Sequence, residues 1–199
     1  MKLLAVSQRV QKVREIDESR DSLDQCFTSF FHVCGYIIAP IPNFPRLNLI
    51  DDFLDNFLNR LAPDGIVISG GDDLGVHVER DLTEFGLLSY AKKKGLPVLG
   101  ICRGMQIIGV YEGANLIPSE NHAGVRHKLH GELQDEVNSY HNYALADCPS
   151  GYSLLAQGLD GSIEAIMNKE KNWYGWMWHP EREQEFQERD INRIKAIFQ

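Results

Sequence analysis

Apolar and polar positions follow two alternating patterns in the first half of the chain. Four short apolar runs carry no polar alternation, which predicts strands buried on both faces. These strands are expected at residues 3–6, 36–39, 65–68 and 97–101. Between them, apolar residues recur every three or four positions, which predicts amphipathic helices. The helices are expected at residues 23–34, 50–61 and 82–94.

This alternation of strand and helix predicts an α/β fold, a mostly parallel central sheet with helices on both faces. Ligand sites in such sheets form at the carboxyl ends of the strands. Two segments of unusual composition, 69–73 and 102–104, follow predicted strands there. Residues 115–178 are less regular and predict extra short strands and loops, followed by a last helix over 183–198. A length of 199 residues fits one domain over 1–199.

Composition and charge narrow the classes of function. The formal net charge of −8 disfavours nucleic-acid binding, which usually needs a basic stripe. No run approaches the ~20 apolar residues of a membrane span, so we expect no membrane partner and a cytoplasmic location. The four cysteines form no Cys-x-x-Cys pair, and Cys26 and Cys34 fall in a predicted helix. We therefore expect buried free thiols, no metal and no cofactor. Whether the chain forms a homodimer stays open.

A nucleophile is predicted at Cys102. The segment 97–106 has the form strand, Gly-x-Cys-x-Gly, helix. A nucleophile at a sharp strand-to-helix turn needs small residues two positions away on either side, and Gly100 and Gly104 meet that need. The helix N-terminus would favour a thiolate, and the backbone N–H of Arg103 would point at the developing oxyanion. A buried cysteine without chemistry is the alternative, but it leaves the two glycines unexplained.

A thiolate needs a base, and His179 is the best candidate. It ends an apolar run and is followed by Pro180, which fixes a turn, and Glu181, which can fold back to orient the imidazole. Nucleophile, base and orienting group would then form a triad. A histidine in a surface turn is the alternative, and the His-Pro-Glu string alone would favour it. The strand–turn–helix motif at residues 97–106, which we call the elbow, reverses that preference.

These motifs, the Ser-Gly-Gly loop at 69–71 and the segment 138–141 resemble class I glutamine amidotransferase-like proteins in order and spacing. The resemblance covers nearly the whole chain and implies the flavodoxin-like α/β fold of that family. It also implies hydrolysis of a γ-glutamyl amide, with release of L-glutamate and an amine. Cys102 would form a glutamyl thioester, His179 would be the base and Glu181 its orienting group.

The resemblance implies further roles around the triad. Gly71, or else Gly70, and Arg103 would supply the N–H groups of the oxyanion hole. Gln106 would contact the glutamyl group. The residues expected to hold the α-amino and α-carboxylate groups are Asn138, Ser139, Tyr140 and His141.

The elbow also indicates a branch of the family. Ammonia-channelling subunits typically show Cys-Leu-Gly-His-Gln, whereas residues 102–106 look more like stand-alone γ-glutamyl hydrolases, which include γ-glutamyl-γ-aminobutyrate hydrolases. The segments 6–10, 20–25 and 40–43 resemble a small bacterial subgroup associated with capsule and other surface-polysaccharide pathways. One member of that subgroup hydrolyses a γ-glutamyl cytidine-diphosphate (CDP) amidate, which frees a nucleotide phosphoramidate.

Three functions therefore compete. The first is a stand-alone hydrolase, acting on a γ-glutamyl CDP amidate or on a γ-aminobutyrate conjugate. The second is the ammonia-donating glutaminase subunit of a two-chain synthetase, which the Arg103 elbow disfavours. The third is a non-enzymatic binding module, which the intact set of Cys102, His179 and Glu181 disfavours.

A cationic cluster at residues 122–130 stands out in this acidic chain. A phosphate-bearing leaving group would need such a patch, although a solvated loop is an equal alternative. The proposed contacts to the leaving group are Arg9, Arg126, His127 and Lys128. Asp72 and Asp73 are expected to cap the next segment rather than bind a substrate amine. Asp81 and Glu84 are expected only to complement a helix dipole.

Overall fold

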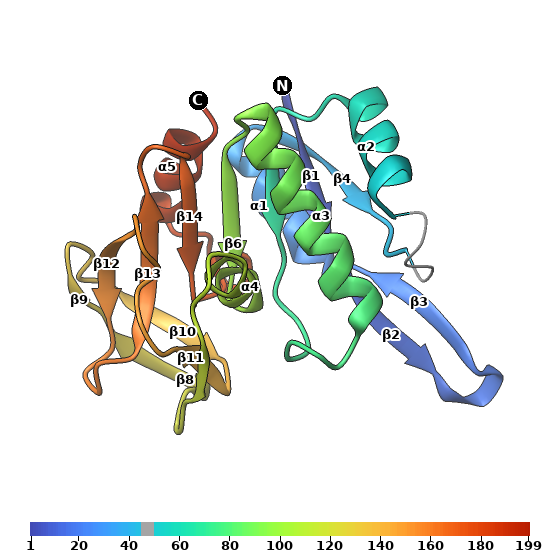
Figure 1. The fold of residues 1–199 in the computed structure, drawn as a ribbon. Helices are drawn as coiled ribbons and strands as arrows, with labels where there is room; N and C mark the ends of the chain where they lie inside the picture. Colours follow the sequence, from blue (N-terminus) through green and yellow to red (C-terminus); the bar gives the residue numbers. More distant parts are fainter. Residues whose placement is uncertain (45–49) are drawn as a thin grey trace.

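A computed structural model describes residues 1–44 and 50–199, and of residues 50–52 it describes the backbone alone. Within this part of the chain, eight strands form the central sheet (Figure 1). Their spatial order is β4 (Tyr36–Ile41), β1 (Lys2–Ser7), β5 (Gly65–Ile68), β6 (Val98–Ile101), β14 (Trp173–Trp176), β13 (Ile163–Asn168), β12 (Ser153–Gln157) and β9 (His130–Gly131). The strands from β4 to β14 run parallel, and the last three pairings are antiparallel.

Helices cover both faces of the sheet, as predicted. They are α1 (Gln25–Cys34), α2 (Ile50–Leu61), α3 (Val78–Lys94), α4 (Arg103–Tyr111) and α5 (Glu188–Ile197). One hydrophobic cluster joins α1 and α5 to one face, and a second joins α2, α3 and α4 to the other. The α/β fold with a mostly parallel sheet is confirmed. Among the described residues, no helix has the length and hydropathy that a bilayer span requires.

The predicted elements agree with the structure most closely where local signals are strong. Helix α1 begins after Asp24, whose side chain accepts a hydrogen bond from the Cys26 backbone N–H at 2.9 Å. It ends at Gly35, which adopts a left-handed conformation that glycine favours. Of the cysteines in this helix, Cys34 is buried as predicted, but Cys26 is exposed. The side chain of Ile50, in the second predicted helix, lies outside the described residues.

Two differences from the predicted elements concern short segments, whereas the extra short strands predicted over 115–178 are present. A hairpin of β2 (Arg9–Val13) and β3 (Glu18–Ser22) was not predicted; it pairs only with itself and projects from the sheet (Figure 1). The last helix begins at Glu188 rather than near 183, because a 3-10 turn at Pro180–Arg182 and an extended segment precede it. The irregular second half contains small sheets of β8 (Ala123–Lys128) with β10 (Glu136–Tyr140) and of β7 (Leu116–Pro118) with β11 (Tyr143–Leu145).

The turn between β6 and α4 is the tightest crossing in the fold. Cys102 lies at its tip with φ 53° and ψ −109°, a conformation that residues with a side chain rarely adopt. A Cβ atom on Gly100 would collide with the carbonyl of Gly104. A Cβ atom on Gly104 would collide with the carbonyl of Ile68 in β5. Both flanking glycines are therefore required where strand and helix cross.

We predict that Gly104→Ala costs about 3 kcal/mol of unfolding free energy, the upper end of overpacking costs. The added methyl group meets the Ile68 carbonyl, which a central strand holds in place. Denaturant unfolding measures the loss. Val110→Ala, at a half-buried position of the same helix, is the control and should cost about 1 kcal/mol. Equal stability of Gly104→Ala and the native chain would contradict this packing.

Candidate active site

The three predicted catalytic side chains lie together at the carboxyl ends of neighbouring strands. Cys102 follows β6, and His179 and Glu181 follow β14, which pairs with β6 in parallel. The backbone N–H of Cys102 donates to the Trp176 carbonyl at 2.6 Å, so the two strand ends are directly joined. Each of the three side chains is at most 5% exposed. Their roles remain predictions, but the sheet topology places them where a triad requires.

Hydrogen bonds hold both the imidazole and the backbone of His179. Its Nδ1 lies 2.6 Å from Oε1 of Glu181, which leaves Nε2 free for chemistry. The side chain of Asn138 accepts from the His179 backbone N–H and donates to its carbonyl, both at 2.8 Å. This pairing of side chain and backbone holds the base in register with the strand end.

The environment of His179 favours its protonated form. Burial lowers the pKa of the imidazole, but the negative charge of Glu181 and the interaction with the Cys102 side chain outweigh burial and raise this pKa to about 9. At neutral pH the ring is therefore an imidazolium. An imidazolium stabilises a neighbouring thiolate, and it can protonate a departing amine.

Gly70 and Gly71, the two candidates for one N–H group of the oxyanion hole, lie in the glycine loop after β5 and have different surroundings. A Cβ atom on Gly70 would collide with the His179 ring, so Gly70 packs against the base. Gly71 lines the cavity at Cys102, and its φ of +150° favours glycine. Arg103, directly after the nucleophile, lines the same cavity. The geometry therefore favours Gly71 over Gly70 as the partner of Arg103.

A cavity of about 290 Å³ opens at Cys102. The predicted substrate contacts Gln106, Tyr140 and His141 line it, and so do Asp72 and Asp73, which we expected only to cap a segment. Carboxylates on this wall offer partners for a substrate amino group. A cavity of this size suits a small, polar group such as a glutamyl moiety.

Two of the predicted substrate contacts do not reach the cavity. Asn138 is buried, and its amide is taken up by the backbone of His179 and by Glu183 at 2.9 Å. Ser139 is fully buried, with its hydroxyl 3.4 Å from Nδ1 of His122. Only the end of the predicted segment lines the cavity at Cys102, after an irregularity in the pairing of β10 between Ser139 and Tyr140. Asn138 therefore supports the base rather than the substrate.

The four predicted contacts to the leaving group differ in where they lie relative to the Cys102 cavity. Arg126 forms an ion pair with Glu183 at 2.9 Å, and Nε2 of His127 faces the Glu164 carboxylate at 3.5 Å. Neither these residues nor the exposed Lys128 lines the cavity at Cys102, so this part of the prediction is corrected. Within the cationic cluster, Arg126 and His127 thus face acidic residues rather than the cavity. Arg9 alone of the four lies in a pocket that adjoins the cavity.

The sequence analysis missed a buried ion network beneath the site. Glu84 is fully buried, accepts hydrogen bonds from Arg80 Nε at 2.9 Å and Ser7 Oγ at 2.8 Å, and pairs with Arg103. Asp81 pairs with the other end of the Arg103 guanidinium. The expectation that both acids serve only a helix dipole is therefore wrong. No sequence signal marked them, because their positions in the helix also fit its solvated first turns.

Comparison with known proteins decides the family. Residues 41–197 match the family model of glutamine amidotransferase class-I. The chain belongs to the class I glutamine amidotransferase family. Among its relatives, the gamma-glutamyl-CDP-amidate hydrolase of Campylobacter jejuni is 35% identical over 124 residues, which cover 59% of this chain and 62% of that protein. A glutamine-hydrolysing GMP synthase of Streptococcus uberis is 34% identical over 155 residues, 71% of this chain and 29% of the synthase.

Solved structures agree on the fold of this amidotransferase-family chain. A protein of Thermoplasma acidophilum, described as one subunit of a GMP synthase, superposes with a TM-score of 0.73 at 20% identity. The superposition covers 100% of this chain and 94% of that one. The chain thus spans nearly all of this structural neighbour, but under two thirds of the Campylobacter hydrolase.

We predict that the rate of this amidotransferase-family protein falls as pH rises through about 9, where the His179 imidazolium loses its proton. Glu181→Gln removes the charge that raises this pKa, so the alkaline limb should move to lower pH. Profiles of kcat/KM against pH on a chromogenic γ-glutamyl anilide measure the alkaline limb of the native protein and that of Glu181→Gln. Glu183→Gln, which neighbours Asn138 but not the imidazole, is the control. A limb that stays in place in Glu181→Gln would contradict the assigned pair.

We predict that Cys102→Ala abolishes turnover and leaves the fold intact. A diazo-ketone analogue of glutamine should label Cys102 and spare Cys26, Cys34 and Cys148. Cys26 is exposed, and the neighbouring Asp24 raises its pKa, so it is accessible but a poor nucleophile. Mass spectrometry of labelled peptides makes the assignment. Label on Cys26 with Cys102 free would exclude Cys102 as the nucleophile.

Proposed function

We propose that this protein hydrolyses a γ-glutamyl amide whose leaving amine carries phosphate, with a γ-glutamyl nucleotide amidate as the substrate class and the CDP amidate as the first candidate. The observation that carries this proposal is a basic pocket beside the cavity at Cys102. Hydrolysis of such an amidate would free a nucleotide phosphoramidate, as the resemblance to the surface-polysaccharide subgroup implies.

In the proposed mechanism, Sγ of Cys102 attacks the γ-carbonyl carbon of the substrate. The new S–C bond pushes the carbonyl electron pair onto oxygen, where the backbone N–H groups of Gly71 and Arg103 stabilise the charge. The C–N bond then breaks, and the His179 imidazolium gives its proton to the leaving nitrogen. Water attacks the resulting thioester with His179 as base, which releases glutamate and regenerates the thiolate.

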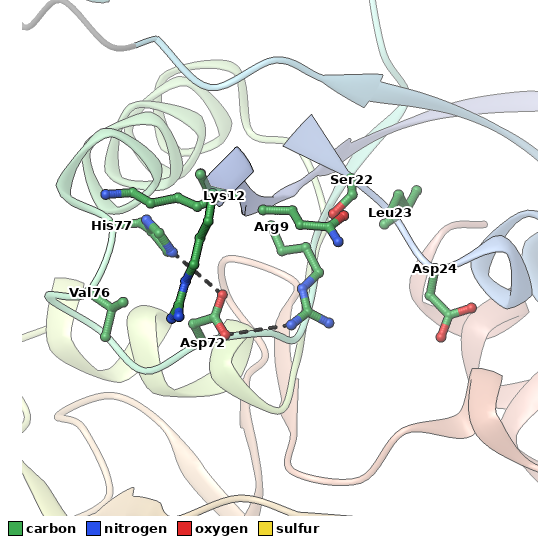
Figure 2. Close-up of a pocket in the computed structure, with 11 residues that line it drawn as sticks. Arg9, Lys12, Ser22, Leu23, Asp24, Asp72, Val76 and His77 are labelled. Carbon is green, nitrogen blue, oxygen red and sulfur yellow. Dashed lines mark ion pairs between the residues drawn. The ribbon is translucent and has the colours of Figure 1, made fainter. Parts of the chain in front are cut away.

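The basic pocket has a volume of about 640 Å³, within the range of small-molecule sites. The β2–β3 hairpin supplies Arg9 and Lys12, the turn of that hairpin supplies Arg14, and His77 faces them from the start of α3. Figure 2 shows Asp72 between Arg9 and His77, with ion-pair distances of 3.5 and 3.7 Å. Arg9, Lys12 and Arg14 outnumber the two carboxylates that line the pocket, Asp24 and Asp72, although the chain has a formal net charge of −8.

The two hollows share a wall, which supports a substrate that spans both. Asp72 and Val76 line the basic pocket and the cavity at Cys102 alike. Lys12 and Arg14 have no acidic partner among the described residues, so both are available to phosphate oxygens through charge-assisted hydrogen bonds. The smaller cavity suits the glutamyl group, and the larger pocket suits a nucleotide.

The comparisons support the same substrate class. The Campylobacter relative is named for a gamma-glutamyl-CDP-amidate. The hairpin at residues 9–22 lies outside the range 41–197 that the family model matches. The element that would read the leaving group is therefore separate from the part of the chain that family members share.

The similarity to a GMP synthase favours a second candidate, an ammonia-donating role within a two-chain synthetase. That function predicts weak glutaminase activity alone and a strong increase with a synthetase partner. A γ-glutamyl-γ-aminobutyrate substrate is a third candidate, but its small carboxylate would leave most of the 640 Å³ pocket unfilled.

We predict that Lys12→Ala lowers kcat/KM on γ-glutamyl CDP amidate about 10- to 100-fold, the effect of losing one charge-assisted hydrogen bond. Hydrolysis of glutamine and neutral γ-glutamyl amides should barely change, because the bonds made by Cys102 are the same. Steady-state kinetics on both substrates make the comparison.

Arg126→Ala is the matched control, since Arg126 is cationic but pairs with Glu183 away from the pocket. It should leave both rates near the native values. Equal loss on both substrates in Lys12→Ala would make the pocket structural. The ammonia-donating function would be favoured if the native protein does not hydrolyse the amidate and gains glutaminase activity with a synthetase partner.

A further inference from the structure

Three histidines surround one buried carboxylate behind the wall of the Cys102 cavity. His122 precedes β8, His127 lies in β8, His141 follows β10, and Glu164 lies in β13. His122, His141 and Glu164 are at most 6% exposed, and the side chain of His127 is 16% exposed. Three segments that are distant in sequence thus bring four metal-ligating side chains close together. The proposed hydrolysis uses none of them chemically.

The distances within this histidine cluster differ from those of hydrogen bonds. Oε1 of Glu164 lies 3.3 Å from His141 Nε2 and 3.6 Å from His122 Nδ1, and Oε2 of Glu164 lies 3.5 Å from His127 Nε2. Hydrogen bonds between such groups are typically 2.7–3.2 Å long. Ligands bound tetrahedrally to one ion at about 2.0–2.1 Å lie about 3.3–3.4 Å from each other. The potential ligand atoms of His122, His127 and Glu164 all fall within 4.8 Å of one another.

Several atoms that face the centre of the cluster lack a partner. Among the described residues, Nε2 of His127, Nε2 of His141 and Oε2 of Glu164 are buried and form no hydrogen bond. Buried polar atoms without a partner are rare because they cost free energy.

The outer ring atoms of the histidines are already held. Nε2 of His122 lies 2.9 Å from Oδ2 of Asp160. Nδ1 of His141 lies 3.1 Å from the Tyr143 carbonyl. Metal-ligating histidines almost always donate their second N–H to a carboxylate or a backbone carbonyl, which orients the ring and selects the tautomer. Two of the three histidines have this arrangement, with the other nitrogen directed inward.

We propose that His122, His127 and Glu164 bind one divalent transition-metal ion, with Zn²⁺ as the first candidate, and that the neighbouring His141 turns toward the ion as the fourth ligand. Three imidazole nitrogens and one carboxylate oxygen suit Zn²⁺, whereas Mg²⁺ and Ca²⁺ prefer sets of oxygen ligands. This inference departs from the sequence-based expectation of no metal, which rested on the cysteines. It does not depend on the proposed substrate.

Four protein ligands would make this a closed, structural site. The ion would join the β8–β10 sheet to β13 of the central sheet (Figure 1). His141 lines the Cys102 cavity, and the neighbouring Tyr140 packs edge-on against His179 with ring centroids 5.7 Å apart. The metal would therefore fix the cavity wall opposite the nucleophile, without touching the reacting atoms.

The test is titration of the full chain with Co²⁺ after removal of metals with a chelator. We expect one Co²⁺ per chain, with the intense visible absorption of a tetrahedral site, displaced by one equivalent of Zn²⁺. His127→Ala should weaken binding at least about 100-fold, and Asp160→Asn, which changes the outer partner of His122 but no proposed ligand, about 10-fold. His130→Ala is the control: this histidine is exposed, lies nearby in β9 and is outside the cluster.

Circular dichroism and Cys102 labelling by the glutamine analogue verify that each variant is folded. Zn²⁺ should also raise the melting temperature of the native protein and of His130→Ala, but not that of His127→Ala. Native protein that is folded yet binds no Co²⁺ would overturn the proposal and leave a cluster neutralised by protons. Equal binding by His127→Ala and His130→Ala would also overturn it, because the ion would then sit elsewhere on the surface.

Discussion

The geometry of the site depends on the hydrogen bonds and ion pairs of the buried Glu84 carboxylate. It binds Ser7 at the end of β1, Arg80 in its own helix and Arg103 directly after the nucleophile. Arg80 in turn donates to the carbonyls of Ser69 and Gly70 at 2.8 and 3.0 Å. Three strand ends and the glycine loop are thus joined through one charge. Removing one partner would leave the others as buried, unpaired charges, which is strongly destabilising. The position of the oxyanion-hole candidates and the turn at Cys102 are coupled for this reason.

Local signals explain how much of this could be predicted from the sequence. Continuous apolar runs identified the parallel strands because burial on both faces leaves no polar position, and Gly65–Ile68 agrees residue for residue. The elbow at Cys102 was predictable because its glycines answer a steric requirement within five residues. The hairpin at residues 9–22 was not predictable, because its strands are mostly exposed and no apolar periodicity marks them. The burial of Glu84 and the meeting of the three histidines around Glu164 depend on long-range packing, which single-sequence patterns do not contain.

Under the proposed function, two structural units recognise the two parts of the substrate. The cavity at Cys102 is built from the ends of central strands and from segment 140–142, all within the range that class I glutamine amidotransferases share. The adjoining pocket owes its positive charge chiefly to the hairpin. The cationic cluster at residues 122–130 was the main candidate in the sequence, yet Arg126 pairs with Glu183 and Glu136, and His127 faces Glu164. Position beside the Cys102 cavity, rather than the presence of charge, separates the two cationic regions.

The attachment of the hairpin has an evolutionary consequence. Its two strands pair only with each other, and at its base Asp21 accepts hydrogen bonds from the backbone and side chain of Asn43 at 2.9 and 2.7 Å. Within the hairpin, Val10 is the buried residue, so most positions can be exchanged without disturbing the core. Selection can therefore change the side chains proposed to meet the leaving group while Cys102, His179 and the sheet stay constant. Under the proposed function, an inherited reaction can acquire new substrates through changes in one exposed hairpin, residues 9–22, the kind of surface segment that tolerates change.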